Sequence, residues 1–259
     1  MSEWRFFEEY MNPREIVLEQ VNHRATETVP YTFALDEVVA EGLDEHYGDT
    51  PWREKLIPYM VHCGGIDRRK ASPLKEGYNI DPFGSVWRID RRPFHLEKPG
   101  MAAPSFDGYD FPTNETFANP DLQSGAEKAL QENPDSFSIL SLGWGLWETY
   151  WGIRGFENAM MDVVAEPEFM GALLDRLTDM YLDQISWCKD IPVDGFFFGD
   201  DWGGQRGVLI GPDSWRKLFK PRYARIYAAA HEQGKCVMSH SCGSVYEIIP
   251  DIIEIGLDA

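Results

Sequence analysis

Apolar runs and helical patterns alternate regularly in the second half of the chain. Short apolar runs predict strands at 137–142, 193–199 and 235–239, and 257–259 has the pattern of one more strand. Two of these strands, 193–199 and 235–239, lie about forty residues apart, with a helical pattern between them. This alternation predicts a parallel sheet that is covered by helices.

Helices are predicted between and after these strands. Apolar residues recur at helical spacing from about 156 to 164, along a long segment that Pro167 opens, and from Pro212 to Gly234. A further helix is expected at 245–253, closed by Gly256. Proline at the first helical position and glycine just after the last one are common start and stop signals.

The first half of the chain has a weaker pattern. A helix is expected over residues 1–25, a strand over 29–35 and a second helix over 36–46. Residues 48–135 are rich in Pro, Gly and Asp and predict long loops, with 83–90 as a strand or hairpin arm. Loops of this length are uncommon in compact domains and tend to be functional or mobile.

We therefore expect one α/β domain over residues 1–259, a (β/α)8 TIM-type barrel with long loops in 48–135. Such barrels typically take ~250 residues or more. Because the strands predicted here are fewer than eight, we expect the natural protein to continue past Ala259, so that the closing βα units are absent from this chain. An open, doubly wound sheet is the alternative.

Composition narrows the class of partner. The formal charge of −19 disfavours nucleic acid and anionic membranes, because such a surface repels phosphate groups. The four cysteines suggest no disulfide framework in a chain of this length, and residues 1–5 lack a signal-peptide pattern. We expect a cytoplasmic protein that acts on small molecules; a homodimer is left open.

His240 and Cys242 end an apolar strand together. Side chains at positions i and i+2 of an extended segment point the same way, so the imidazole and the thiol converge. These groups are zinc ligands, but a zinc site that keeps an open position needs three protein ligands. A core cysteine beside a hydrogen-bonded histidine is the alternative. Candidates for a third ligand are Asp200, Asp201, Glu148, Cys63 and residues beyond Ala259.

The preceding predicted strand ends on two carboxylates, Asp200 and Asp201. Adjacent side chains at a strand end diverge, so one carboxylate can face a pocket while the other binds loop backbone. A carboxylate in the pocket could orient a substrate, bind metal or transfer protons. A purely structural loop, built from turn-forming Asp and Gly, is the alternative.

Aromatic residues follow the strand at 137–142. Trp144, Trp147, Trp151 and Tyr150 could wall a flat or cationic ligand, with Glu148 as a catalytic or anchoring carboxylate. Core packing between loop and helix is the competing interpretation. In the loop after residue 199, Trp202 and Gln205 are further candidates for substrate contact. His62–Cys63 is a weak metal candidate, because adjacent strand residues diverge.

Several short motifs occur in a fixed order along nearly the whole chain. They are Asn12-Pro13-Arg14-Glu15, Asn22-His23-Arg24, Val29-Pro30, Asp81-Pro82-Phe83-Gly84 with Trp87, Arg154-Gly155-Phe156-Glu157-Asn158 with Asp162, Asp200–Gln205, His240–Gly243, Ile249-Pro250 and Gly256–Ala259. In this order they resemble the uroporphyrinogen decarboxylase superfamily, and more narrowly its corrinoid-dependent methyltransferase branch.

The resemblance implies a (β/α)8 barrel with its site at the carboxyl ends of the strands. It also implies a zinc site in which His240 and Cys242 match an H-x-C pair, with a later cysteine that would lie beyond Ala259. The corrinoid (cobalamin) would be carried by a partner protein. The Arg-Gln-Ala-Gly-Arg motif of the true decarboxylases is absent from this sequence.

The sequence therefore predicts a zinc-assisted methyltransferase that moves a methyl group between a corrinoid and either a small-molecule donor or a thiol acceptor. An aryl methyl ether or a methylamine would suit the aromatic residues. Two other hypotheses remain: a metal-free decarboxylase that acts on a tetrapyrrole, and a binding barrel without catalysis.

Overall fold

A computed structural model describes residues 11–33, 35–48, 51–67 and 71–259 of the protein. Its main sheet has four parallel strands in the order β1-β6-β7-β8, so each strand lies beside the next one of that sheet in the chain. Connections between these strands run through helices, as expected for βα units. The four strands are β1 (Met60–Gly65), β6 (Phe137–Trp144), β7 (Gly195–Gly199) and β8 (Cys236–His240).

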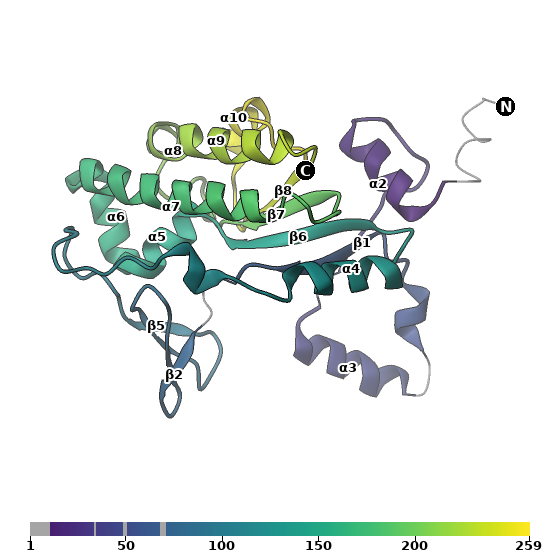
Figure 1. The fold of residues 1–259 in the computed structure, drawn as a ribbon, viewed down its shortest axis with the longest axis horizontal. Coiled ribbons are helices and arrows are strands. Elements are labelled where there is room, and N and C mark those ends of the chain that lie inside the picture. Colours follow the sequence, from purple (N-terminus) through teal and green to yellow (C-terminus); the bar gives the residue numbers. More distant parts are fainter. Residues whose placement is uncertain (1–10, 34, 49–50, 68–70) are drawn as a thin grey trace.

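The described residues form nine α-helices, and Figure 1 shows α7 and α9 running along one side of this sheet. The α-helices are α2 (Pro13–Val21), α3 (Glu37–Tyr47), α4 (Leu122–Glu132), α5 (Leu146–Arg154), α6 (Phe156–Ala165), α7 (Pro167–Trp187), α8 (Pro212–Leu218), α9 (Lys220–His231) and α10 (Ile249–Glu254). Three short 3-10 helices are η1 (Trp52–Lys55), η2 (Asn114–Phe117) and η3 (Tyr246–Ile248). No helix in the described ranges is both long and apolar enough to cross a membrane.

Alternate residues of the parallel strands face two different environments. Leu140, Phe196 and Val237 have no exposed surface and join the large core that also includes residues of α7 and α9. Their strand neighbours Phe197 and Met238 belong to a smaller cluster on the opposite, inner face, where α2 packs. Side chains two residues apart in a strand face the same side, so His240, two residues after Met238 in β8, lies on the inner face.

A second, antiparallel sheet lies near α5 and α6 (Figure 1). The Oγ of Ser85 donates a hydrogen bond to the carbonyl of Gly152 at 2.8 Å, and the N–H of Met101 donates to the carbonyl of Ile153 at 3.0 Å. Both contacts fix the sheet to the end of α5. The four strands are β2 (Ser72–Lys75), β3 (Tyr78–Ile80), β4 (Val86–Arg88) and β5 (His95–Lys98).

Two of the motifs quoted from the sequence hold elements together. Arg14 of α2 donates hydrogen bonds of 2.6 to 3.1 Å to Asp194, whose carboxylate also accepts from Ser138 at the start of β6. In the buried core, Arg154 and Tyr150 both donate to Asp162 at 2.7 Å. These contacts give the motifs structural roles.

In the second half of the chain the predicted elements are confirmed within a few residues. The segment opened by Pro212 is divided into α8 and α9, and the final predicted helix into η3 and α10. In the first half, α3 confirms the helix expected at 36–46, and α2 confirms part of the helix expected at 1–25. Residues 1–10 of that expected helix lie outside the described ranges.

Two expectations for the first half are wrong. Of the strand expected at 29–35, the described residues 29–33 and 35 form no strand. Residues 48–135 are not simply loops, because they hold β1, the whole antiparallel sheet and α4. Of these strands only β4 was expected, in the arm at 83–90. All residues of β2 are exposed, so this strand lacks the apolar alternation that reveals a half-buried strand.

The end of the chain begins to extend the parallel sheet beyond β8. The N–H of Ser239 donates to the carbonyl of Ala259 at 2.9 Å, and the N–H of Asp258 donates to the carbonyl of Val237 at 3.0 Å. Within the described residues the sheet is open, with β1 and β8 as the outer strands of its ladder. The parallel strands in chain order are consistent with a TIM barrel, but the described residues form no closed barrel.

Candidate functional site

The candidate site lies where β7 and β8 end. Gly199 and His240 are paired in register, and their strands continue directly into Asp200–Asp201 and Ser241–Cys242. Because carboxyl ends of parallel strands meet at one edge, the sequence brings five polar side chains, including that of His240, to this edge. Trp144, at the end of β6, is paired with Gly199 on its other side. Two strand spacings, about 10 Å, therefore separate the backbone of Trp144 from that of His240.

Three of these side chains form a compact group that we call the rim cluster: Asp201, His240 and Cys242. One potential ligand atom from each lies within 4.8 Å of the other two. The Nε2 of His240 is 3.3 Å from the Sγ of Cys242 and 3.5 Å from the Oδ1 of Asp201. The cluster is open to solvent, since His240 and Cys242 are exposed.

The rim cluster has an electrostatic character that suits a cation. A hydrogen bond with Asp201, partial burial and the negative charges of Asp201 and Glu148 raise the pKa of the Cys242 thiol. The same negative charges attract a metal ion, and a bound metal ion deprotonates a coordinating thiol. The site is therefore better suited to metal binding than to holding a free thiolate.

Close backbone contacts fix the two loops that carry the rim cluster. The N–H of Cys242 donates to Asp201 at 2.7 Å, and the N–H of Trp202 donates to the Oγ of Ser241 at 3.0 Å. Gly243 has a φ of +74°, and a Cβ atom there would lie 2.4 Å from the backbone of Gly203. This geometry requires glycine at residue 243.

Asp200 faces away from the rim cluster and has no exposed surface. Its carboxylate accepts hydrogen bonds from the N–H groups of Trp147 and Glu148 at 3.0 and 2.8 Å and from the indole of Trp202 at 2.6 Å. The hydroxyl of Tyr223 donates to it as well. Burial raises the pKa of Asp200 to about 6, although these donors oppose the shift. This geometry anchors the first turn of α5, and a catalytic role for Asp200 stays a prediction.

Three predicted substrate contacts are placed in the core. Trp147, Tyr150 and Trp202 are at most 3% exposed. The indole of Trp147 packs against Phe219, and the indole of Trp202 packs against Trp215. The alternative interpretation, core packing, fits the burial of these three rings, and substrate contact by any of them stays a prediction.

Trp144, Glu148 and Gln205 are the remaining predicted residues. Trp144 and Glu148 are half-buried near the ends of the strands, and Gln205 is exposed in the loop after β7. Glu148 lies close enough to influence the charge state of Cys242. Cys63 is buried on the outer side of β1, within the large core, and is not part of the rim cluster.

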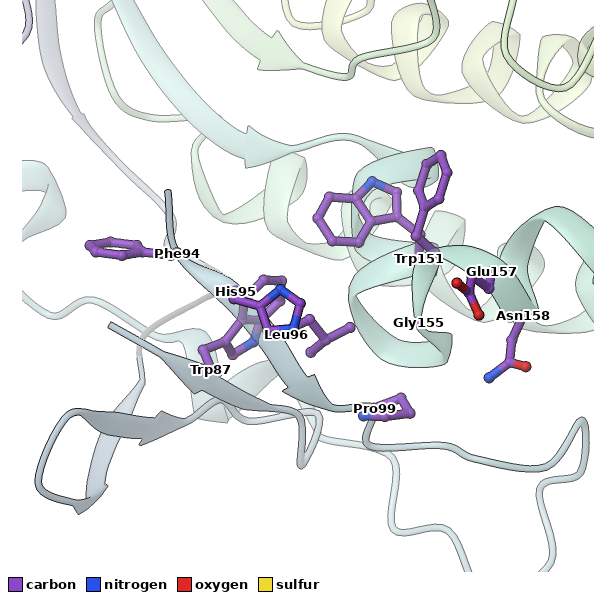
Figure 2. Close-up of a pocket in the computed structure, with 10 residues that line it drawn as sticks. Trp87, Phe94, His95, Leu96, Pro99, Trp151, Gly155, Glu157 and Asn158 are labelled. Atoms are coloured by element: carbon purple, nitrogen blue, oxygen red, sulfur yellow. The ribbon is translucent and has the colours of Figure 1, made fainter. Parts of the chain in front are cut away.

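Half-buried tryptophans line two hollows beside the site. The inner hollow has a volume of about 300 Å³ and is lined by Trp144 together with Trp87, Trp151 and Asp67. The outer groove, about 540 Å³, lies between the antiparallel sheet and α5–α6 (Figure 2). The sequence predicts Trp151 as a possible wall residue of a pocket, whereas Trp87 is noted there only within a motif.

The fold and the site define an α/β protein with parallel strands in chain order and candidate ligands at their carboxyl ends. Residues 144–259 match the uroporphyrinogen decarboxylase (URO-D) family. This match supports the predicted superfamily for this part of the chain.

A solved structure of a methyltransferase from Methanosarcina mazei has a similar fold. It has a TM-score of 0.64 and 15% sequence identity, and the alignment covers 96% of this chain and 75% of that one. At this identity the likeness shows the fold alone. A comparison with curated proteins finds no match.

Proposed function

We propose that this protein is a zinc-assisted methyltransferase that works with a corrinoid. The observation that carries the proposal is the rim cluster, which offers a nitrogen, a sulfur and an oxygen ligand within 4.8 Å of one another. The match to the uroporphyrinogen decarboxylase family supports an enzyme, and the fold shared with a methyltransferase favours methyl transfer.

The donor set fits zinc. Tetrahedral zinc with bonds of 2.0 to 2.3 Å to imidazole, thiolate and carboxylate places neighbouring ligand atoms about 3.4–3.6 Å apart. The corresponding distances from the Nε2 of His240 are 3.3 Å to Cys242 and 3.5 Å to Asp201. Three protein ligands leave the fourth position of a catalytic zinc site for a substrate atom.

A zinc ion at this position would supply Lewis acidity, which either lowers the pKa of an acceptor thiol or polarises the oxygen or nitrogen of a methyl donor. His240, Cys242 and Asp201 hold the ion in this proposal. Glu148 lies beside them and orients the substrate or exchanges a proton with it. Asp200 acts on the site indirectly, because its hydrogen bonds fix the first turn of α5, which contains Glu148.

The corrinoid part of the proposal rests on the resemblance of the sequence motifs. We propose that a separate protein carries the corrinoid to the strand ends, where His240 and Cys242 are exposed. The substrate would enter the inner hollow, which is lined by Trp144 at the end of β6.

Metal analysis and methyl transfer test the proposal together. Wild-type protein purified with zinc should contain about one ion per chain and should transfer methyl groups between methylcobalamin and a thiol, or from a methyl donor to cob(I)alamin. Cys242→Ala should lose both properties. Cys236→Ala is the matched control, because Cys236 lies at the opposite end of the same strand.

Zinc retained at the wild-type level by Cys242→Ala would show that the rim cluster is not the site. Porphyrin formation from uroporphyrinogen by metal-free protein would instead establish the decarboxylase hypothesis and overturn the proposal.

A further inference from the structure

The outer groove presents aromatic surface that folding has not buried. Figure 2 shows Trp87 on the antiparallel sheet across from Trp151, with Glu157 at the start of α6 on the same side as Trp151. Phe156 is 44% exposed and lies with its ring centre 6.2 Å from that of Trp151. Exposed aromatic surface that lines a hollow is typical of a ligand site.

The groove is held in shape by a hydrogen bond on the Trp87 side and by a contact between two indole rings. The indole N–H of Trp87 donates to the buried carboxylate of Asp81 at 2.7 Å, which fixes the ring. Its ring centre is 5.9 Å from that of Trp151 in an edge-on arrangement, so the two indoles pack against each other. A ligand would therefore meet a preformed wall.

The charge of the groove favours a cation. Glu157 is its acidic residue, and the residues that line it in the described part of the chain include no lysine and no arginine. The inner hollow shares Trp87 and Trp151 and adds the carboxylate of Asp67. The nearby Arg92, whose guanidinium lies 5.5 Å from the ring of Phe94, is itself paired with Asp36 at 2.9 Å. The net charge of −19 attracts cations toward the surface as a whole.

We infer that the outer groove binds a small organic cation, a tertiary or quaternary ammonium group, on the faces of its aromatic rings. A methylated ammonium group combines apolar methyl surface with a charge that aromatic faces attract, and Glu157 balances this charge. The inference concerns binding alone and does not depend on metal at the rim cluster.

Equilibrium titration of the full-length protein at pH 8 tests the inference. The ligands are choline, its uncharged isostere 3,3-dimethylbutan-1-ol and the anion 3,3-dimethylbutanoate, which share one bulky end. We expect choline to bind about 10-fold more tightly than the alcohol. The anion should bind most weakly. Equal binding of choline and the alcohol, tighter binding of the anion, or no saturable binding of choline would overturn the inference.

Two variants locate the bound cation. Glu157→Gln should weaken choline binding about 2- to 5-fold, as expected for an exposed ion pair. Phe156→Leu should weaken it to a similar extent, because the apolar volume is kept and the aromatic face is lost. Glu168→Gln, an exposed carboxylate outside the groove, should have no effect. Choline binding that is unchanged in Glu157→Gln and Phe156→Leu would place the cation elsewhere.

Discussion

Neighbouring residues at the end of β7 have separate tasks. Asp200 turns into the core and accepts four hydrogen bonds, while Asp201 turns outward to His240 and Cys242. This divergence follows from the alternation of side chains along an extended chain. It lets two consecutive carboxylates connect the rim cluster to the core without competing for the same partners.

Gly243 gives a prediction at the scale of one residue. Gly243→Ala would force a Cβ into the backbone of Gly203 at a φ of +74°, so the two loops must separate. We expect loss of at least 10-fold in zinc affinity, measured by competition with a chelator. The control is Gly125→Ala in α4, where a Cβ meets no atom within 4 Å and alanine is expected to stabilise the helix by about 1 kcal/mol. Wild-type zinc affinity in Gly243→Ala would contradict the conclusion that the two loops require glycine at residue 243.

The buried Arg154–Asp162 pair gives a second prediction at this scale. Both side chains are at most 4% exposed, so Asp162→Asn leaves an uncompensated buried guanidinium. We expect the free energy of unfolding, measured by urea denaturation, to fall by about 3–5 kcal/mol. Asp179→Asn breaks the exposed pair with Arg225 and should cost less than about 1 kcal/mol. Similar losses of unfolding free energy in the two variants would contradict the expectation that breaking a buried ion pair costs more than breaking an exposed one.

At the scale of elements, the accuracy of sequence-based prediction followed burial. The strands β6, β7 and β8 are predictable because they are apolar and bounded by turns. β2 is fully exposed and gives no apolar pattern, whereas Val29 and Phe33 are apolar yet exposed and outside any strand. Apolar runs report strands only where the fold buries them.

The candidate site could be predicted only in part. His240 and Cys242 share one strand end, so their convergence follows from local geometry. The choice of Asp201 over Asp200, Glu148 and Cys63 depends on how β7 lies beside β8, which no local pattern contains. The assignment of Trp147 and Tyr150 to the core depends on α5, which the sequence reasoning did not identify.

Asp251 connects elements and gives a pH-dependent prediction. Its carboxylate accepts from Arg216 of α8 at 2.9 Å and from Lys220 of α9 at 2.8 Å, and these contacts hold its pKa below the usual value. A lowered pKa in the folded state means that the stabilisation is present above the unfolded pKa, about 3.9, and is lost as pH falls through the folded pKa.

Thermal unfolding of the wild type and of Asp251→Asn at several pH values checks the direction of this pH dependence. The wild type should have the higher melting temperature at pH 6 to 7, and the difference should shrink steadily below about pH 4. A difference that grows as the pH falls would contradict the assignment.

At the scale of the whole molecule, the rim cluster should couple metal binding to stability. Its ligands come from the ends of two strands, β7 and β8, so a metal ion that binds only the folded state adds to the free energy of unfolding. At a free zinc concentration 100-fold above the dissociation constant the gain is about 2.7 kcal/mol. For a domain of this size each kcal/mol raises the melting temperature by about 2–4 °C, so we expect a rise of about 5–10 °C.

Scanning calorimetry with and without zinc measures this rise in melting temperature. Cys242→Ala should abolish the rise, whereas His46→Ala, which alters an exposed histidine on α3, should retain it. A rise that persists in Cys242→Ala would place the stabilising metal at another part of the molecule.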